Sequence, residues 1–242
     1  MARVAPVIPA ETDLLCEQCG YTLNGLPDDG RCPECGTPVS RSQFPDRWPS
    51  AWDIYTPSGF SRTSFEVIFH PTRFYRTLLT RGEEARARQF AHIHWWTAAT
   101  LIGLAASMHV LWFLRLVGAV RTENPLAFLG AVVVSIPVIY ALLAWTTGLA
   151  ASLTHWEASY RGLRLPKRVV RRGLYFHAAH YLPVAILTLL TVFGYQVLLP
   201  SLRDANSASY YLYTLSAEVV LFAGYLFHTY WIGMRNMMYA NK

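Results

Sequence analysis

Charged residues are scarce in this chain of 242 residues, because Lys, Arg, Asp and Glu make up 15% of it, against 53% hydrophobic residues. An ordinary soluble domain has about 25% charged residues. The deficit excludes a disordered or highly solvated protein and indicates that lipid surrounds much of the chain. The charges are concentrated in residues 1–93 and 155–172. We therefore expect a membrane protein with a polar head.

Signals of several other protein classes are also missing from the sequence. Residues 1–15 contain Pro6 and Pro9 but no apolar run of about 7 to 15 residues, so we expect no cleaved signal peptide. The net charge of +6 is not arranged as a basic stripe with interleaved aromatics, and we expect no nucleic-acid partner. G-x-S-x-G, P-loop, Gly-rich dinucleotide and H-E-x-x-H motifs are absent. We therefore expect a non-enzymatic protein.

Long apolar segments are what the sequence has in abundance. They cover residues 95–114, 125–154, 173–202 and 211–234, and only the last contains a formal charge, at Glu218. A bilayer core requires about 20 apolar helical residues. We predict an all-α membrane protein with four transmembrane helices in a bundle, at about residues 94–118, 126–151, 174–199 and 211–234. The length of the middle two segments leaves a fifth or re-entrant segment open.

Basic residues are distributed unevenly between the connections of these spans. Five arginines precede the first span (Arg73, Arg76, Arg81, Arg86 and Arg88), and six basic residues separate the second from the third (Arg161, Arg164, Lys167, Arg168, Arg171 and Arg172). The other two connections contain only Arg121 and Arg203. The positive-inside rule then places both termini in the cytoplasm. We expect a multi-pass protein of the cell (inner) membrane.

All four cysteines lie in residues 1–48, where Cys16, Cys19, Cys32 and Cys35 form C-x2-C-x12-C-x2-C. Two such turns can direct four sulfurs at one ion in the tetrahedron that zinc prefers. Two disulfides would need an oxidising compartment, which the expected topology denies, and a redox dithiol would explain only one pair. An iron site is the remaining alternative. We predict that these four cysteines bind a structural Zn2+ ion.

The motif resembles that of the zinc-ribbon family, and the resemblance covers residues 16–36. It implies a small N-terminal β module, here residues 1–48, whose folding energy comes from the metal. Zinc ribbons serve as protein-binding modules, nucleic-acid contacts or fold staples. Because a basic stripe is lacking, we expect a protein partner at this module. The sequence contains no feature that defines an oligomeric state.

Residues 49–93 form a juxtamembrane segment between the cysteine module and the transmembrane domain, residues 94–242. Pro71 predicts one or two short amphipathic helices on the bilayer surface, with Arg73 and Arg76 toward water. The side chains predicted to face lipid are Phe65, Ile68, Phe69, Phe74 and Leu78. A helix packed on the protein itself is the alternative.

Pro71, Phe74 and Tyr75 match a P-x-x-F-[FY] element that precedes the first span in the Yip1 family of multi-spanning membrane proteins. The chain resembles that family over residues 64–242, although four spans are expected here where the family usually has five. The resemblance implies a non-enzymatic role in membrane organisation or trafficking. With the cysteine module, it favours a protein that recruits a partner to the membrane.

Two other functions stay open at this point. One is a small channel or transporter. The other is a haem or metal redox protein that uses the histidines predicted near the cytoplasmic ends of the spans, namely His92, His94, His155, His177, His180 and His228. We favour single hydrogen bonds by these histidines, because no acidic or cysteine ligand accompanies them at metal-binding spacing. Glu218 and Arg115 are the charges expected deepest in lipid, and we expect them to pair.

Overall fold

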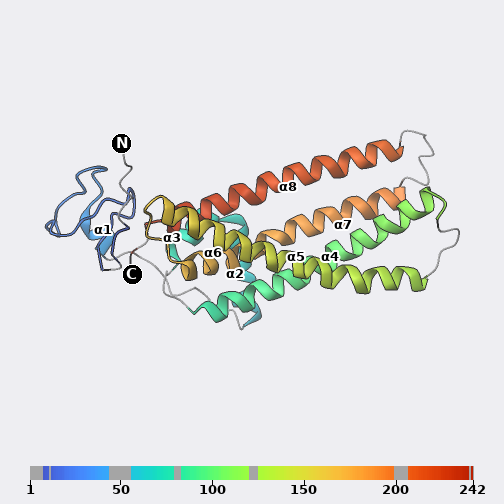
Figure 1. Ribbon diagram of the computed structural model, residues 1–242, viewed down its shortest axis with the longest axis horizontal. Coiled ribbons are helices and arrows are strands. Elements are labelled where there is room, and N and C mark those ends of the chain that lie inside the picture. The colour runs from blue at the N-terminus through green and yellow to red at the C-terminus, as the bar shows by residue number, and fades with distance from the viewer. Residues whose placement is uncertain are drawn as a thin grey trace. The chain divides into compact units, whose positions relative to one another are not determined.

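The structure is a computed structural model that describes residues 8–10, 12–43, 56–78, 83–119, 125–198, 207–239 and 241. Helices dominate beyond the N-terminal region (Figure 1). In chain order they are α1 (Val39–Gln43), α2 (Pro57–Phe69), α3 (Pro71–Thr77), α4 (Glu84–Leu116), α5 (Pro125–Tyr160), α6 (Lys167–His177), the 3-10 helix η1 (Ala178–His180), α7 (Tyr181–Leu198) and α8 (Ser207–Met237).

The chain divides into two compact units. Unit 1 comprises Met1–Phe90, Thr147–His177 and Thr229–Lys242, and unit 2 comprises Ala91–Thr146 and Ala178–His228. Unit 1 therefore contains the cysteine module, α2, α3, α6 and the end of α8. Unit 2 contains most of α4 and α5, all of α7 and the first part of α8.

Four helical segments are long and apolar enough to cross a membrane. They are α4, α5, α8 from Ala208 to Met237, and the stretch Lys167–Gln196 that α6, η1 and α7 form together. The most apolar part of α5 is not buried inside the protein at all, and it exposes large side chains such as Leu129 and Val133. A helix of this kind is stable where lipid covers it. The four predicted apolar helices are thus confirmed.

Within unit 2, α4 packs against α5 through small residues. A Cβ atom on Gly103 would lie 2.8 Å from Cγ1 of Ile136, so the two backbones approach closely at this point. The Ser107 hydroxyl lies 3.4 Å from that of Ser135. Small residues and hydroxyl contacts are the usual means of helix association in lipid, where apolar side chains gain nothing by leaving the bilayer.

The other side of α4 in unit 2 meets α7 and α8. Ala105, Val192 and Tyr211 are buried together there, with Trp112 and Tyr195 packed against them. The Tyr195 and Tyr211 rings stack with their centroids 3.8 Å apart. One helix thus contacts three others, as a bundle requires.

Glu218 in α8 forms a hydrogen bond within the same unit, but its partner is not the predicted Arg115. One carboxylate oxygen accepts a hydrogen bond from the Thr191 hydroxyl of α7. The other oxygen has no hydrogen-bond partner among the described residues. The predicted pairing with Arg115 is therefore replaced by a hydroxyl contact, because α7 brings Thr191 against this turn of α8.

The juxtamembrane segment forms two short helices that meet at Pro71, in line with the prediction. The Thr56 side chain caps α2 by accepting a hydrogen bond from the Gly59 backbone N–H at 3.2 Å. The predicted lipid-facing set does not form one face, however. Phe65 and Phe69 are exposed, whereas Phe74 and Leu78 are buried in the protein. Helix α3 thus packs on the protein itself, which was the alternative for this segment.

The N-terminal cysteine module contains no sheet within its described residues. The expected β structure is limited to two isolated antiparallel bridges, Leu15 with Thr22 and Arg31 with Pro38. Each bridge closes one cysteine turn and extends no further. A zinc-ribbon sheet is therefore not part of the described fold.

Candidate metal centre

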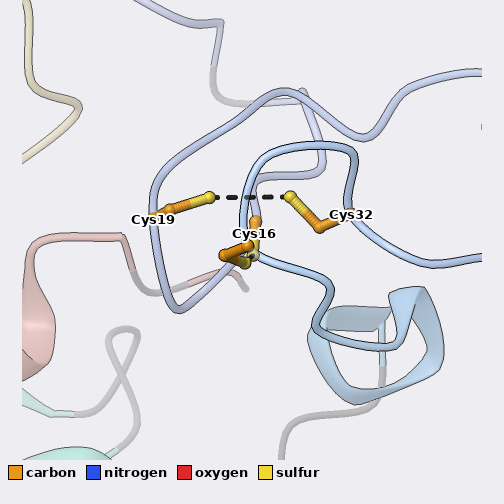
Figure 2. A group of neighbouring side chains, drawn as sticks. Cys16, Cys19 and Cys32 are labelled. Carbon is orange, nitrogen blue, oxygen red and sulfur yellow. Dashed lines mark hydrogen bonds between the residues drawn. The ribbon is translucent and has the colours of Figure 1, made fainter.

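The four cysteine sulfurs form one cluster, in which all lie within 4.8 Å of one another. The Cys16 and Cys35 sulfurs are 3.4 Å apart, and those of Cys19 and Cys32 are 3.6 Å apart. Figure 2 shows the latter two facing each other, with Cys16 beside them. Thiolates about 2.3 Å from a tetrahedral ion lie about 3.8 Å apart, whereas a disulfide bond measures about 2.05 Å. The four cysteines are therefore close enough to bind a metal ion.

Two similar backbone turns, residues 16–20 and 32–36, hold the sulfurs. In the first, the Gly20 N–H donates to the Cys16 carbonyl at 2.8 Å, and in the second, the Gly36 N–H donates to the Cys32 carbonyl at 2.9 Å. Both glycines have a positive φ, 82° and 72°, which disfavours residues with a Cβ atom. The glycine after each C-x2-C pair is thus what closes the turn.

A small apolar core packs against the cysteine cluster. Leu23 and Val39 are buried together with Cys16 and Cys32, and Leu14 and Leu26 pack against them. This core is small for an independent fold, since fewer than about 40 residues seldom bury enough apolar surface. The module therefore needs either a bound ion or contacts with the rest of unit 1.

The thiols differ in their readiness to lose a proton. Burial raises the pKa of Cys16 and of Cys19. Hydrogen bonds to the side chain and backbone of Thr37 lower the pKa of the exposed Cys35 to about 6. Cys35 thus loses its proton more readily than Cys16 or Cys19. The Cys16 and Cys19 thiols lose their protons only in exchange for a strong ligand such as a metal cation.

Asn241 attaches the module to the tail that follows α8. Its side-chain amide donates to the carbonyls of Leu15 at 2.6 Å and Ser42 at 3.0 Å. Its side-chain oxygen accepts from the Leu15 N–H at 3.0 Å, and its own N–H donates to the Glu17 carboxylate at 3.0 Å. Because Leu15 immediately precedes Cys16, the tail holds the backbone that positions a cysteine of the cluster.

Arg164 and Tyr239 strengthen this attachment. The Arg164 guanidinium donates to the carbonyls of Ala10 at 2.7 Å and Asp13 at 2.6 Å, and also to the Asn241 side-chain oxygen at 3.1 Å. The Tyr239 ring lies against Gly20, where a Cβ atom would be 2.5 Å from the ring. The tail after α8 therefore covers the first cysteine turn, and the loop after α5 holds the residues just before it. The sequence did not predict these roles for Asn241, Arg164 or Tyr239. Arg164 was identified only as one of the basic residues between the second and third spans.

The histidines considered as a possible haem or metal ring have separate partners within each unit. His92 lies 2.5 Å from the Tyr140 hydroxyl and His180 lies 2.8 Å from that of Tyr225 in unit 2. In unit 1, His177 lies 3.0 Å from the Thr229 hydroxyl. In the part of the chain that the structure describes, the cysteines form the group with metal-ligand geometry. Hydrogen bonding is therefore the role that these contacts support.

The Phe74 and Tyr75 side chains of the P-x-x-F-[FY] element serve packing. The Phe74 ring lies 5.1 Å from that of Phe176 in α6, and the Tyr75 hydroxyl donates to the Gly173 carbonyl at 3.3 Å. Tyr75 also lies against Gly233 of α8. The element thus joins α3 to α6 and α8 within unit 1.

Four apolar helices and a cluster of four thiols define the class of this chain, a multi-pass membrane protein with a potential metal-binding centre. No family model, curated protein or solved structure matches the chain. The resemblances to the zinc-ribbon and Yip1 families therefore rest on their motifs alone.

Proposed function

We propose that the chain is a non-enzymatic protein of the cell (inner) membrane whose cytoplasmic cysteine module holds one structural zinc ion and recruits a protein partner. The observation that carries this proposal is the cluster of four thiols within 4.8 Å, fixed through Leu15 and Asn241 to the tail of a membrane helix. A module held in this way presents its remaining surface in a constant orientation at the membrane.

Zinc is the metal that best matches the cluster. Four thiolates fill a tetrahedral coordination sphere and leave no open position for water or substrate, which is typical of structural and not of catalytic zinc sites. Zinc also undergoes no redox change, so it serves as a fold staple without side reactions. Binding of zinc by small modules contributes about 10 kcal/mol or more, which offsets the small apolar core.

The second cysteine turn is the best candidate for partner contact. Pro33, Glu34 and Gly36 are exposed there, and Asp29 is exposed in the preceding loop. A Cβ atom on Gly36 would meet nothing within 4 Å, whereas Gly20 of the first turn is covered by Tyr239. We call Asp29, Pro33, Glu34 and Gly36 the outer face of the module. Its two carboxylates favour a partner with a basic surface.

The zinc assignment is tested by elemental analysis of the full chain purified in detergent. We expect one zinc per chain, no iron and no visible absorption band. Cys32→Ser should lose the metal and unfold residues 8–43, while the helices still insert in the membrane. Iron in place of zinc, or no metal in the wild-type protein, would contradict the assignment.

Partner recruitment is tested by photo-crosslinking in intact membranes. A photoreactive amino acid replaces Glu34 on the outer face or, as the control, Ser40, which is exposed on α1. We expect a discrete crosslinked product from position 34 and none from position 40. Glu34→Arg should abolish capture of that partner without changing the zinc content. Equal crosslinking from both positions would argue against a defined partner surface.

One observation favours a channel or transporter as the second candidate function. Glu218 is a carboxylate within a membrane helix, and one of its oxygens has no hydrogen-bond partner among the described residues. Ionisable residues in such positions often mark ion or proton pathways. Proton or cation flux in liposomes that is lost in Glu218→Gln would support this candidate over partner recruitment.

A further inference from the structure

An open hollow of about 450 Å³ lies at the elbow between α2 and α3 in unit 1. Its lining includes Phe69, His70, Thr72, Arg73, Arg76 and Thr77. The elbow exists because α2 ends at Phe69 and Pro71 starts a new helix, since a proline ring disrupts the hydrogen bonding of a continuing helix. Two arginines, a histidine and two hydroxyl groups thus surround one concave surface.

The opposite side of α3 fixes this hollow in place. Phe74 and Tyr75 are buried, and both contact α6 through Phe176 and Gly173. Helix α6 is the first part of the membrane-crossing stretch Lys167–Gln196. The hollow is therefore attached to the beginning of a span.

Among the described residues, no ion pair neutralises the positive charge in the hollow. Arg73 and Arg76 are exposed and three residues apart, which places them on the same side of α3. The ion pairs within the described residues involve Arg86, Arg161 and Arg171 instead. Two neighbouring guanidinium groups repel each other, and an anion between them removes this repulsion and accepts charge-assisted hydrogen bonds.

Apolar surface adjoins this positive charge. The Phe65 and Phe69 side chains are 53% and 62% exposed, and their rings lie 4.7 Å apart. An exposed aromatic pair is unfavourable in water and typical of segments that enter the lipid interface. A ligand that satisfies both features carries an anionic group next to hydrocarbon, which describes a phospholipid better than a soluble anion.

The short connection between α3 and α4 limits how far the hollow can lie from the first membrane-crossing helix. Helix α3 ends at Thr77, and α4, the first membrane-crossing helix, begins at Glu84. Seven residues span at most about 25 Å when fully extended. The elbow is therefore restricted to the side of the membrane on which α4 begins.

We infer that this hollow binds the headgroup of an anionic glycerophospholipid. Arg73 and Arg76 pair with the phosphate, the Thr72 hydroxyl donates to one of its oxygens, and Phe65 and Phe69 contact the first part of the acyl chains. The site depends on the membrane location of the chain and is independent of the partner proposed for the cysteine module.

Titration of the full chain in neutral detergent with dioctanoyl phosphatidylglycerol tests this site. Dioctanoyl phosphatidylcholine and inorganic phosphate serve as parallel ligands. We expect binding of the anionic lipid that Arg73→Gln/Arg76→Gln weakens about 30-fold, on the scale of two basic contacts with an anionic headgroup. Lys167→Gln/Arg168→Gln removes the same charge from exposed positions elsewhere and should weaken binding by less than about threefold.

The melting temperature without lipid should be the same for both double variants, because all four side chains are exposed. If Arg73→Gln/Arg76→Gln is less stable, Arg73→Lys/Arg76→Lys keeps the charge and should recover most of the affinity. Equal losses in the two Gln variants would overturn the site. So would equally tight binding of phosphatidylcholine, or inorganic phosphate that displaces the lipid at equal concentration.

Discussion

Asn241 forms hydrogen bonds with three residues of the cysteine module, namely Leu15, Glu17 and Ser42, and no sequence motif indicated this role. It is 6% exposed, and its side chain bonds both backbone groups of Leu15 as a neighbouring strand would. The module thereby gains the pairing that a second β-strand supplies in a sheet. A side-chain amide is well suited to this role, because it offers a donor and an acceptor in one plane.

We predict that Asn241→Ala releases the cysteine module from the tail. The change leaves the N–H and carbonyl of Leu15 and the carbonyl of Ser42 without their partner, and each buried unsatisfied group costs about 1 to 3 kcal/mol. Amide hydrogen exchange at residues 12–43 should then be about 100-fold faster.

Asn236→Ala is the matched control for this prediction, because the Asn236 side chain donates within its own helix, to the Ile232 carbonyl. It should leave exchange in the cysteine module unchanged. Similar exchange rates in the wild-type protein and in Asn241→Ala would show that the module is held by other contacts.

Arg172 in α6 is a second buried polar residue, and its burial is only partly compensated. It is 2% exposed, and none of its three guanidinium nitrogens has a hydrogen-bond partner among the described residues. Its charge lies 5.9 Å from the centre of the Phe176 ring, a contact worth about 2 kcal/mol at most. Burial of an unpaired charge costs several kcal/mol, so the contact offsets only part of the cost.

We therefore predict that Arg172→Met keeps or increases the stability of the protein. Methionine fills a similar volume, packs well beside an aromatic ring and carries no charge to desolvate. Thermal unfolding in detergent should give a melting temperature equal to or above that of the wild type. A marked decrease would mean that the guanidinium binds a group from lipid or from a partner.

At the level of elements, the two cysteine turns have the same backbone conformation but different neighbours. Both end in a glycine of positive φ, but Tyr239 covers Gly20, whereas a Cβ atom on Gly36 would meet open space. Alanine at either position costs about 1 to 2 kcal/mol of backbone strain. The difference between the two substitutions therefore isolates the contact with the tail.

We predict that Gly20→Ala loosens the module more than Gly36→Ala. Limited proteolysis of the full chain should cleave residues 8–43 faster in Gly20→Ala, because the new methyl group collides with the Tyr239 ring. With the ring removed only the backbone strain remains, so adding Gly20→Ala to Tyr239→Ala should speed cleavage no more than Gly36→Ala speeds it in the wild type. Identical behaviour of the two glycine variants would refute a specific contact at the first turn.

Sequence patterns predicted the elements whose cause is local. Bilayer thickness requires long apolar helices, and metal coordination requires paired cysteines. Each requirement therefore produces a pattern of residue spacing that can be recognised in the sequence. The attachment of the module joins Leu15 to Asn241, which are 226 positions apart, and a bond to backbone groups leaves no motif. Phe74 and Leu78 were assigned to lipid, because periodicity identifies an apolar face without showing whether lipid or protein covers it.

For the whole molecule, the contact between Leu15 and Asn241 constrains the membrane topology. Two residues joined by hydrogen bonds lie on the same side of a bilayer, so the chain between them crosses an even number of times. Four apolar helices satisfy this condition, and a fifth complete crossing would break it. The charge distribution in the sequence predicts the same even number of crossings.

The side on which the module lies is the last prediction. The free thiols need a reducing compartment, and eleven basic residues flank the spans on the module's side, against Arg121 and Arg203 on the other. Both arguments predict that residues 15 and 241 lie in the cytoplasm. A reporter that is active only outside the cytoplasm should be silent when fused at Lys242 and active when fused at Arg121. The opposite pattern would expose the cysteines to oxidation and remove the basis for a zinc site. Equal signals from the two fusions would show that the chain crosses the membrane an even number of times between them, which contradicts the three crossings expected.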